Sequence, residues 1–340
     1  MSLPPVEIPL GAMRFNSDSQ KLEYWNGQIW MQIHTANNQV NGGHRGLIMA
    51  GSSHTATIDM ITISTAGDAT DFGDLITGVM LPSGCSSSTR GLSMGGRRTS
   101  PVIQINDIEY VTIQSTGNGT NFGDLVKTNN YGNLGNLGNA TRGMIQGGVA
   151  DNDPASTGLG VDMNYVTIAS EGNAVKFGEC AVSHTYSAGT FSSPTRGVIA
   201  GGGNPGINTT EYITIATTGN AQDFGDLMNN GGQGSAGASS PVIGLVAGGY
   251  YGGSDHDIIE KFTIATRGNS SDFGNLTQVK RWITPVSDSI RACWCGGYGP
   301  ITNVISYCVF ATQGDALDFG DLVDNGGGAA GASSGHGGLG

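Results

Sequence analysis

The sequence predicts an all-β protein, in which residues 38–340 form a six-bladed β-propeller and residues 1–37 form a small N-terminal β-hairpin attachment segment. The composition indicates many short strands joined by tight turns, because 58 of the 340 residues are glycine and only 12% are charged. A phrase close to Asp-Phe-Gly-Asp-Leu occurs six times, at intervals of 46–55 residues. A repeat of about 40–50 residues with strand-like content is typical of propeller blades. The phenylalanines of the phrase mark the structural repeat: Phe72, Phe122, Phe177, Phe224, Phe273 and Phe319.

The N-terminal segment holds three strand-sized pieces, AMRFN, KLEYW and QIWMQI, separated by SDSQ and by Asn26-Gly27. This pattern fits the rules for hairpins. Two or three strands bury too little surface to be stable alone, so the hairpin packs either on the propeller or on another subunit. The preceding Pro-rich arm is expected to be extended and to dock on a partner. The predicted attachment residues are Pro4, Pro5, Trp25 and Trp30.

Each repeat contains four strand-sized pieces. The second begins with Arg in five copies, whereas the fifth copy has Ile243, and in most copies it ends in Gly-Gly. The third alternates, so that Ile213 and Ile215 point to one side and Tyr212 to the other, which is the period of a strand. The fourth piece is the Phe phrase. The first piece is short and carries an apolar residue five positions before the Arg position: Val40, Cys85, Leu137, Phe191, Ala238 and Val286.

The repeated phrase has a local explanation. A Gly-Asn or Gly-Asp pair, such as Gly219-Asn220, lies between the third and fourth strands and is predicted to supply the positive φ of a tight hairpin. Phe224 and Leu227 are predicted to bury against the neighbouring sheet. Gly225, which follows the Phe, is predicted to allow a bulge or a close approach of backbone.

The C-terminal stretch GASSGHGGLG (331–340) resembles GASSPVIGLVAGG (237–249) cut short. It predicts an extra strand that completes the first blade and joins the two ends of the chain. The alternative is a flexible glycine tail.

These features together resemble the kelch repeat, with an Arg ahead of an apolar strand, a Gly-Gly at its end, a Tyr-containing strand and then a bulky aromatic residue. The resemblance covers residues 40–325, although Phe stands where kelch repeats usually have Trp. The phrases EYITIATTGNAQDFGDL and TRGVIAGG are more specifically similar to the kelch-like virion structural proteins of tailed bacteriophages, notably those of marine cyanobacteria. The N-terminal hairpin also resembles a small module of phage fibre and tail proteins.

This resemblance implies a virion protein made in the host cytoplasm, and in particular a tail-fibre or receptor-binding component that displays its propeller for adhesion to the host. The implied partners are other virion proteins through the N-terminal arm, a host-surface glycan or protein, and further copies of the chain in a homo-oligomer. A second interpretation is a purely structural capsid-decoration or tail-assembly protein. A third is a glycan-degrading propeller enzyme.

The residues themselves predict no enzyme, no cofactor and no metal site. The five cysteines occupy apolar positions of the repeat, as Cys180 does where other copies have Leu, which indicates buried side chains rather than disulfides or metal ligands. The six histidines show no metal-ligand spacing. The loop GGVADNDPAS (147–156) is interpreted as solvated rather than as a cation site. Two acidic pairs, Asp255 with Asp257 and Asp151 with Asp153, each lie on one loop and are not the facing carboxylates that a glycan hydrolase requires.

Charge and hydropathy argue against two classes of partner. The net charge is −12, and no basic cluster exceeds Arg97-Arg98 or Lys280-Arg281, so nucleic acid is not an expected partner. No stretch approaches 18 apolar residues, so we expect no insertion into a membrane.

Binding is expected at one end of the propeller. In an antiparallel four-stranded blade, the connection from the second to the third strand and the connection to the next blade emerge at the same end. These connections differ in every copy, and variable loops on a rigid scaffold commonly carry recognition. Their aromatic and polar side chains suit stacking on sugars or anchoring a protein partner, although each ring could instead pack over its own loop. The candidate binding residues of this loop face are Tyr131, Tyr186, Tyr250, Tyr251, Asp255, Trp282 and Tyr298.

Overall fold

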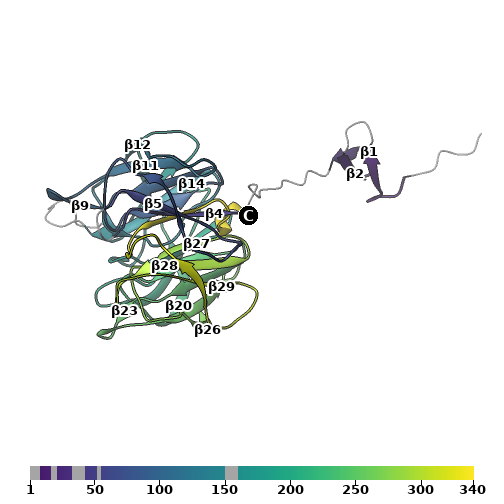
Figure 1. Ribbon diagram of the computed structural model, residues 1–340. Coiled ribbons are helices and arrows are strands. Elements are labelled where there is room, and N and C mark those ends of the chain that lie inside the picture. The colour runs from purple at the N-terminus through teal and green to yellow at the C-terminus, as the bar shows by residue number, and fades with distance from the viewer. Residues whose placement is uncertain (1–7, 17–20, 33–42, 52–54, 150–159) are drawn as a thin grey trace, which may run out of the picture. The chain divides into compact units, whose positions relative to one another are not determined.

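The computed structural model of the chain describes residues 8–16, 21–32, 43–51, 55–149 and 160–340 (Figure 1). The chain divides into two compact units, Met1–Asn38 and Gln39–Gly340. Almost all regular structure in the described residues is strand, and the one helical element described is a single 3-10 turn, η2 (Gly337–Leu339). The predicted all-β class is therefore confirmed. Within the described residues, no helix is long and apolar enough to span a membrane.

The first unit is a three-stranded antiparallel sheet of β1 (Met13–Asn16), β2 (Lys21–Trp25) and β3 (Trp30–Gln32). The side chain of Asn26 accepts hydrogen bonds from the backbone N–H groups of Gln28 and Ile29, which shapes the turn between β2 and β3. On one face of the sheet, Arg14 lies 4.2 Å from the Trp30 ring and forms a 2.9 Å ion pair with Glu23.

The tryptophans predicted to mediate attachment are paired with each other. Trp25 and Trp30 face each other across β2 and β3, with ring centroids 5.6 Å apart, and both are half-buried. The exposed apolar side chains lie on the opposite face of the sheet, because alternate residues of a strand point to opposite sides. That face carries Met13, Phe15, Leu22, Tyr24 and Met31, which are 38–66% exposed. Pro4 and Pro5 lie outside the described residues.

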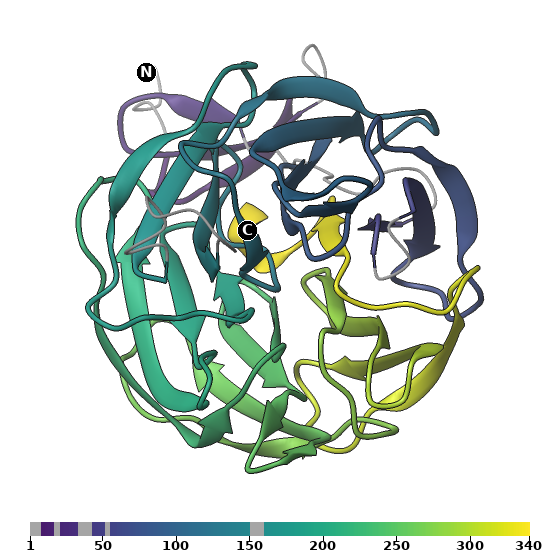
Figure 2. The same ribbon diagram turned by 90° about the vertical axis from the view of Figure 1, so that its left-hand side faces the viewer.

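The second unit consists mainly of six four-stranded antiparallel sheets that follow one another around a central axis, in a propeller-like arrangement (Figure 2). Sheet 1 contains β31 (Ala330–Ser333), β4 (Arg45–Met49), β5 (Thr57–Thr62) and β6 (Thr70–Asp74); sheet 2 contains β7 (Ser83–Ser86), β8 (Arg90–Met94), β11 (Asp107–Thr112) and β12 (Thr120–Asp124); and sheet 3 contains β13 (Asn130–Gly132), β14 (Arg142–Val149), β15 (Asp162–Thr167) and β16 (Val175–Glu179).

Sheet 4 contains β17 (Gly189–Ser192), β18 (Arg196–Ala200), β19 (Ile207–Thr214) and β20 (Gln222–Gly231); sheet 5 contains β21 (Ala236–Ser239), β22 (Ile243–Ala247), β25 (Ile258–Thr263) and β26 (Ser271–Asn275); and sheet 6 contains β27 (Thr284–Ser287), β28 (Arg291–Gly297), β29 (Thr302–Val309) and β30 (Leu317–Asp321). Two small hairpins project from the connections between second and third strands. They are β9 (Arg97–Thr99) with β10 (Val102–Gln104), and β23 (Tyr250–Tyr251) with β24 (Ser254–Asp255).

Sheet 1 is made from both ends of the second unit. Its innermost strand, β31, pairs with β4 in the register Ala330↔Met49 and Ala332↔Leu47. Ala332 faces Leu47 in sheet 1 as Cys85 faces Leu92 in sheet 2, so the two residues occupy equivalent positions of the repeat. Val40, which the sequence predicts for this place, lies outside the described residues.

A circle of hydrogen bonds joins the innermost strands around the axis. Each serine hydroxyl in this circle donates to a backbone carbonyl of the preceding sheet, and sheet 3 contributes an asparagine in place of a serine. The distances are 2.6 Å from Ser333 Oγ to Ser287 O, 3.0 Å from Ser287 Oγ to Ser239 O, 2.8 Å from Ser239 Oγ to Ser192 O, 3.1 Å from Ser192 Oγ to Asn136 O, 3.0 Å from Ser86 Oγ to Asn136 Oδ1 and 2.8 Å from Ser86 Oγ to Ser333 O.

The repeated phrase links each sheet to the next. Gly268, between β25 and β26, donates its N–H to Phe224 O of the preceding sheet at 2.8 Å, and Asn269 Oδ1 accepts the N–H of Asp226 at 3.1 Å. The equivalent two bonds occur at all six junctions between sheets, with Asp in place of Asn at two of them. The phenylalanines of the phrase are all at most 3% exposed.

The prediction of a tight hairpin in this phrase is wrong. β25 ends at Thr263 and β26 begins at Ser271, so the connection is much longer than two residues. Gly268 has a φ of +154°, but its neighbour Asn269 does not adopt a positive φ. The Asn side chain is used to accept a backbone N–H of the preceding sheet, and the connection is long because it has to reach that sheet.

The prediction for the glycine after Phe is confirmed. The pairing of β19 with β20 shifts register between Thr210 and Glu211, which is the signature of a bulge. A Cβ built on Gly225 would lie 2.5 Å from Gly268 O, so the backbones of two sheets approach too closely for a side chain.

The Arg that leads the second strand in five of the six sheets also spans two sheets. The Arg196 guanidinium lies 4.9 Å from the Tyr212 ring, which meets Phe224 edge-on, and its Nη1 donates to Ile264 O of the next sheet at 2.9 Å. Sheets 2, 3 and 6 repeat this stack. The five cysteines are buried and free, and burial raises the pKa of the thiols of Cys85, Cys295 and Cys308 to about 12.

Candidate binding face

A collar of six residues surrounds the axis where the chain enters each sheet. The collar consists of Leu81, Tyr131, Tyr186, Gly234, Trp282 and Gly328, and all six adopt a positive φ. Backbone hydrogen bonds link neighbours of the collar: Gly328 N to Trp282 O is 2.6 Å, Trp282 N to Gly234 O is 2.8 Å, and Leu81 N to Gly328 O and Gly234 N to Tyr186 O are both 2.9 Å. Such a backbone conformation costs about 1–3 kcal/mol for each residue with a side chain, and strain of this kind is concentrated at functional sites.

Four of the predicted aromatic residues meet at this collar. The Tyr131 ring centroid lies 5.5 Å from that of Tyr186 and 5.9 Å from that of Trp282, and the Trp282 and Tyr298 rings are 5.3 Å apart. All four side chains are half-buried. The rings come from different connections, so the alternative in which each packs only over its own loop does not describe them.

Arg281 extends this cluster to two more predicted residues. Its guanidinium lies 4.4 Å from the Tyr250 ring and 4.9 Å from the Trp282 ring, and Nη1 forms a 3.1 Å ion pair with Asp255. Tyr250 and Asp255 are paired across the β23–β24 hairpin. Burial raises the pKa of Asp255 although Arg281 opposes this shift. Arg281 was not predicted as a site residue, because in the sequence it stands out only as part of the basic pair Lys280-Arg281.

Two N–H groups of the cluster have no hydrogen-bond partner in the described part of the chain. They are Nε1 of Trp282 and Nε of Arg281, and both atoms are buried. Buried polar groups are normally satisfied, so a water or a ligand oxygen is the expected partner. Together with the ring faces, these donors suit a ligand that combines apolar surface with hydroxyl or carbonyl oxygens.

Tyr251 is the predicted residue that lies outside this aromatic cluster. Its ring stacks on the imidazole of His256, with centroids 3.6 Å apart and planes at 8°. Burial raises the pKa of its hydroxyl. The neighbouring hairpin residue Tyr250 connects it to the cluster along the chain.

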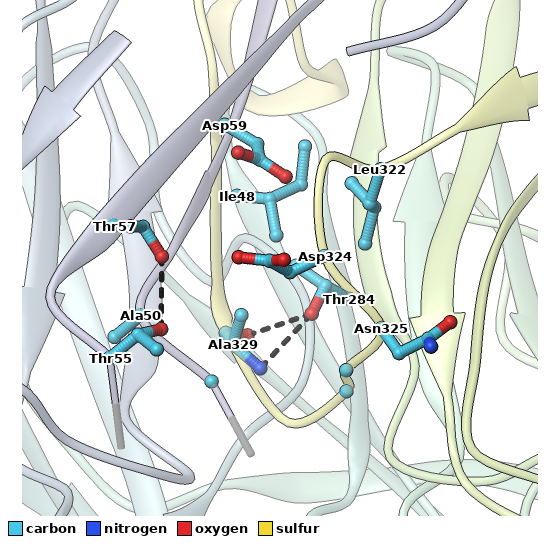
Figure 3. A pocket seen from close by; sticks show the side chains of 13 residues that line it. Ile48, Ala50, Thr55, Thr57, Asp59, Thr284, Leu322, Asp324, Asn325 and Ala329 are labelled. Atoms are coloured by element: carbon cyan, nitrogen blue, oxygen red, sulfur yellow. Dashed lines mark hydrogen bonds between the residues drawn. The ribbon is translucent and has the colours of Figure 1, made fainter. Parts of the chain in front are cut away.

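A pocket of about 340 Å³ adjoins the collar between sheets 6 and 1 (Figure 3). Two of its lining residues, Gly327 and Ala329, flank the collar residue Gly328. Asp59 and Asp324 contribute carboxylates to it, and Asp59 also accepts the backbone N–H of Val323 at 3.1 Å. Burial, reinforced by the charge of Asp324, raises the pKa of Asp59 to about 6.

This pocket was not predicted from the sequence, because Asp59 stands at a position of the repeat where three other copies have Glu. Glu109 accepts the N–H groups of Ile76 and Thr77 at 2.7 and 3.0 Å, and so ties its sheet to the preceding one. Of the acidic pairs considered from the sequence, Asp255 is paired with Arg281, and Asp151 and Asp153 lie outside the described residues.

No protein-family model matches the sequence, and no curated protein matches it. Among solved structures, the chain is similar to one described as "Structure of YjhT", with a TM-score of 0.63 and 10% sequence identity over 80% of this chain and 95% of that chain. The likeness concerns the fold alone at this identity. It extends over most of the chain, so the arrangement of sheets recurs in a protein of very different sequence.

Proposed function

We propose that the chain is a six-bladed kelch-like propeller that binds a host-surface glycan or protein through its collar end, as a tail-fibre or receptor-binding component of a phage particle. The observation that carries the proposal is the aromatic cluster of the collar. It gathers half-buried rings from several variable connections, an arginine paired with a carboxylate, and two buried N–H groups without partners.

The placement within a virion rests on the resemblance of the repeated phrases to phage virion proteins. The N-terminal unit supports attachment, because one face of its sheet exposes five apolar side chains, including Phe15 at 66% and Met13 at 61%. Exposed apolar faces of this kind mark interaction surfaces. In this proposal the first unit contacts other virion proteins and the second unit is displayed.

The experiment measures adsorption of the purified protein to host cells and to an array of host-surface glycans. Tyr250→Ala and Tyr298→Ala remove rings at the edge of the cluster, and each is expected to weaken binding about tenfold or more, as loss of an aromatic contact residue commonly does. Val175→Ala changes an exposed side chain at the start of β16 and serves as the matched control.

Unchanged adsorption with both tyrosine variants would contradict the proposal that the collar end binds the host surface. Absence of any host or glycan binding, together with assembly of the protein into particles, would favour the purely structural interpretation.

A further inference from the structure

Four polar side chains lie buried together at the junction of sheets 3 and 4. Cys180 directly follows β16, His184 lies in the connection to β17, Glu211 belongs to β19 and Gln146 to β14. His184 and Glu211 are each 1% exposed, Cys180 is 5% exposed and Gln146 is fully buried. The Cys180 sulfur, a ring nitrogen of His184 and a carboxylate oxygen of Glu211 all lie within 4.8 Å of one another.

Two of these residues depart from apolar positions of the repeat, and a third occupies a variable position. Cys180 stands where the other five copies have Leu, and Gln146 stands where they have Met, Ala or Cys. His184 stands at a variable position, where the other copies have Val79, Asn129, Gly231, Lys280 and Gly326. Independent departures from an apolar pattern are expected to scatter over the propeller. Here they converge on one buried point.

The hydrogen bonds of His184 show that the buried cluster requires a cation. Nδ1 lies 2.7 Å from Gly201 O, and because a carbonyl only accepts, Nδ1 carries a proton. Nε2 lies 2.9 Å from Glu211 Oε2. In a neutral imidazole this Nε2 presents a lone pair, and an ionised carboxylate also only accepts. A cation, either a proton or a metal ion, must therefore lie between the two atoms.

The Glu211 carboxylate also accepts backbone N–H groups, from Ala181 to Oε1 at 2.8 Å and from Val182 to Oε2 at 3.3 Å, so both of its oxygens are held in place. The bond from Nδ1 to a backbone carbonyl is the arrangement commonly found for metal-bound histidines, because it fixes the tautomer that directs Nε2 to the metal. The equivalent Glu109 and Glu260 accept backbone N–H groups and have no imidazole partner among the described residues.

We propose that this cluster is a structural zinc site, with Cys180 Sγ, His184 Nε2 and Glu211 Oε2 as three ligands. Sulfur, imidazole nitrogen and carboxylate oxygen are the donors that Zn²⁺ takes in tetrahedral sites, at about 2.0–2.3 Å. Gln146 borders the cluster: its Nε2 donates to Gly160 O at 3.0 Å and to His184 O at 3.4 Å, and its Oε1 is buried without a hydrogen-bond partner among the described residues. Ca²⁺ and Mg²⁺ do not fit, because they prefer oxygen ligands alone.

Binding exchanges protons for the metal. Two protons leave for solvent as the metal binds: the Cys180 thiol loses one as the Zn–S bond forms, and the His184–Glu211 pair loses the one it shares, which frees a lone pair on Nε2 and one on Oε2 for the metal without redox change. Because the ligands come from two sheets, the ion holds sheet 3 against sheet 4. Sheet 3 has an irregular inner edge: β13 spans three residues, and a single bridge between Leu134 and Gly189 joins the sheets there.

The experiment measures metal content and stability in the full chain. Protein expressed in zinc-supplemented medium is analysed by elemental mass spectrometry, then unfolded in denaturant with chelator and refolded with or without Zn²⁺, or with Co²⁺ as a spectroscopic probe. The expected results are about one zinc ion per chain, a melting temperature that rises when Zn²⁺ is present during refolding, and a thiolate-to-cobalt charge-transfer band.

Two variants restore the residue type of the repeat at a buried cysteine. Cys180→Leu installs the Leu of the other copies and is expected to fold but to lose the zinc, the cobalt band and the stabilisation by Zn²⁺. Cys308→Val installs the residue found at the equivalent position Val111 of another repeat. This variant is expected to retain the zinc, the cobalt band and the stabilisation by Zn²⁺. Wild-type protein that contains no zinc, shows no cobalt band and melts at the same temperature with and without Zn²⁺ would overturn the proposal and leave a protonated His184–Glu211 pair. Retention of zinc by Cys180→Leu would also overturn it.

Discussion

The close approach between sheets predicts that two glycines of one repeated phrase respond differently to the same change. A Cβ on Gly225 would lie 2.5 Å from the carbonyl carbon and oxygen of Gly268 in the next sheet. A Cβ on Gly219 would meet nothing within 4 Å. Both glycines have a positive φ, +146° and +159° respectively, so replacement by Ala strains the backbone in both and creates a collision only at Gly225.

The magnitude follows from these contacts. Backbone strain costs about 1–3 kcal/mol in either variant. Gly225→Ala adds overpacking of about 1–3 kcal/mol. It also disturbs the two hydrogen bonds that link these neighbouring sheets, from Gly268 N to Phe224 O and from Asp226 N to Asn269 Oδ1, each worth about 1 kcal/mol. The difference between the variants is therefore about 3–5 kcal/mol in the free energy of unfolding, or roughly 5–8 °C in melting temperature for a unit of this size.

The assay is thermal unfolding followed by circular dichroism, with Gly219→Ala as the matched control. Gly225→Ala is expected to melt well below the control. Equal melting temperatures for the two variants would refute the reasoning, because they would show that the backbones can separate without loss and that the phrase does not hold the sheets together.

Two further predictions concern pH. Asp59 holds its proton more tightly in the folded state, with a pKa of about 6 against 3.8, so its ionisation lowers stability as pH rises through 6. Asp59→Asn is expected to raise the melting temperature at pH 8 and to leave it unchanged at pH 4, and an equal gain at both pH values would contradict this. His336 has its pKa lowered to about 4 by burial, against 6.5, so the stability that it contributes is complete above pH 6.5 and is lost as pH falls to 4. His336→Gln keeps a donor to Ser86 O, so its melting temperature is expected to fall less steeply than that of the wild type over this range; parallel curves would argue against the assignment.

The strands could be predicted because they follow from local patterns. Alternation in segments such as EYITIAT identified third strands, and the Phe phrase identified fourth strands at the positions where the structure has them. The turn between them could not be predicted from local rules. Gly268-Asn269 has the composition of a two-residue hairpin, but its hydrogen-bond partners belong to the preceding sheet, about 43 residues earlier in the chain. A rule based on neighbours in sequence cannot represent that contact.

The aromatic residues of the candidate binding face could be selected from the sequence because they lie in variable connections. Their mutual contacts could not be, since Tyr131 and Trp282 are brought to 5.9 Å only by the circular arrangement of the sheets. The positive φ of both residues was also hidden, because neither Tyr nor Trp favours that conformation. The pocket beside the collar was missed for a similar reason: Asp324 and Asp59 come from opposite ends of the chain and meet where the ends join.

The buried cluster at sheets 3 and 4 has an instructive counterpart at sheets 5 and 6. Lys280 occupies the position of His184 and is fully buried, and Ser306 occupies the position of Glu211. The Lys280 ammonium donates to Val304 O at 3.3 Å and to Trp294 O at 3.5 Å, and burial lowers its pKa to about 8. That junction thus supplies its own cation together with neutral acceptors. The His184 junction instead supplies a carboxylate, a thiol and an imidazole lone pair, which are acceptors or ligands that require a cation from outside. The equivalent positions Lys280 and His184 therefore both lie at sites that require a positive charge. At Lys280 the side chain carries that charge, whereas at His184 a proton or a metal ion has to supply it.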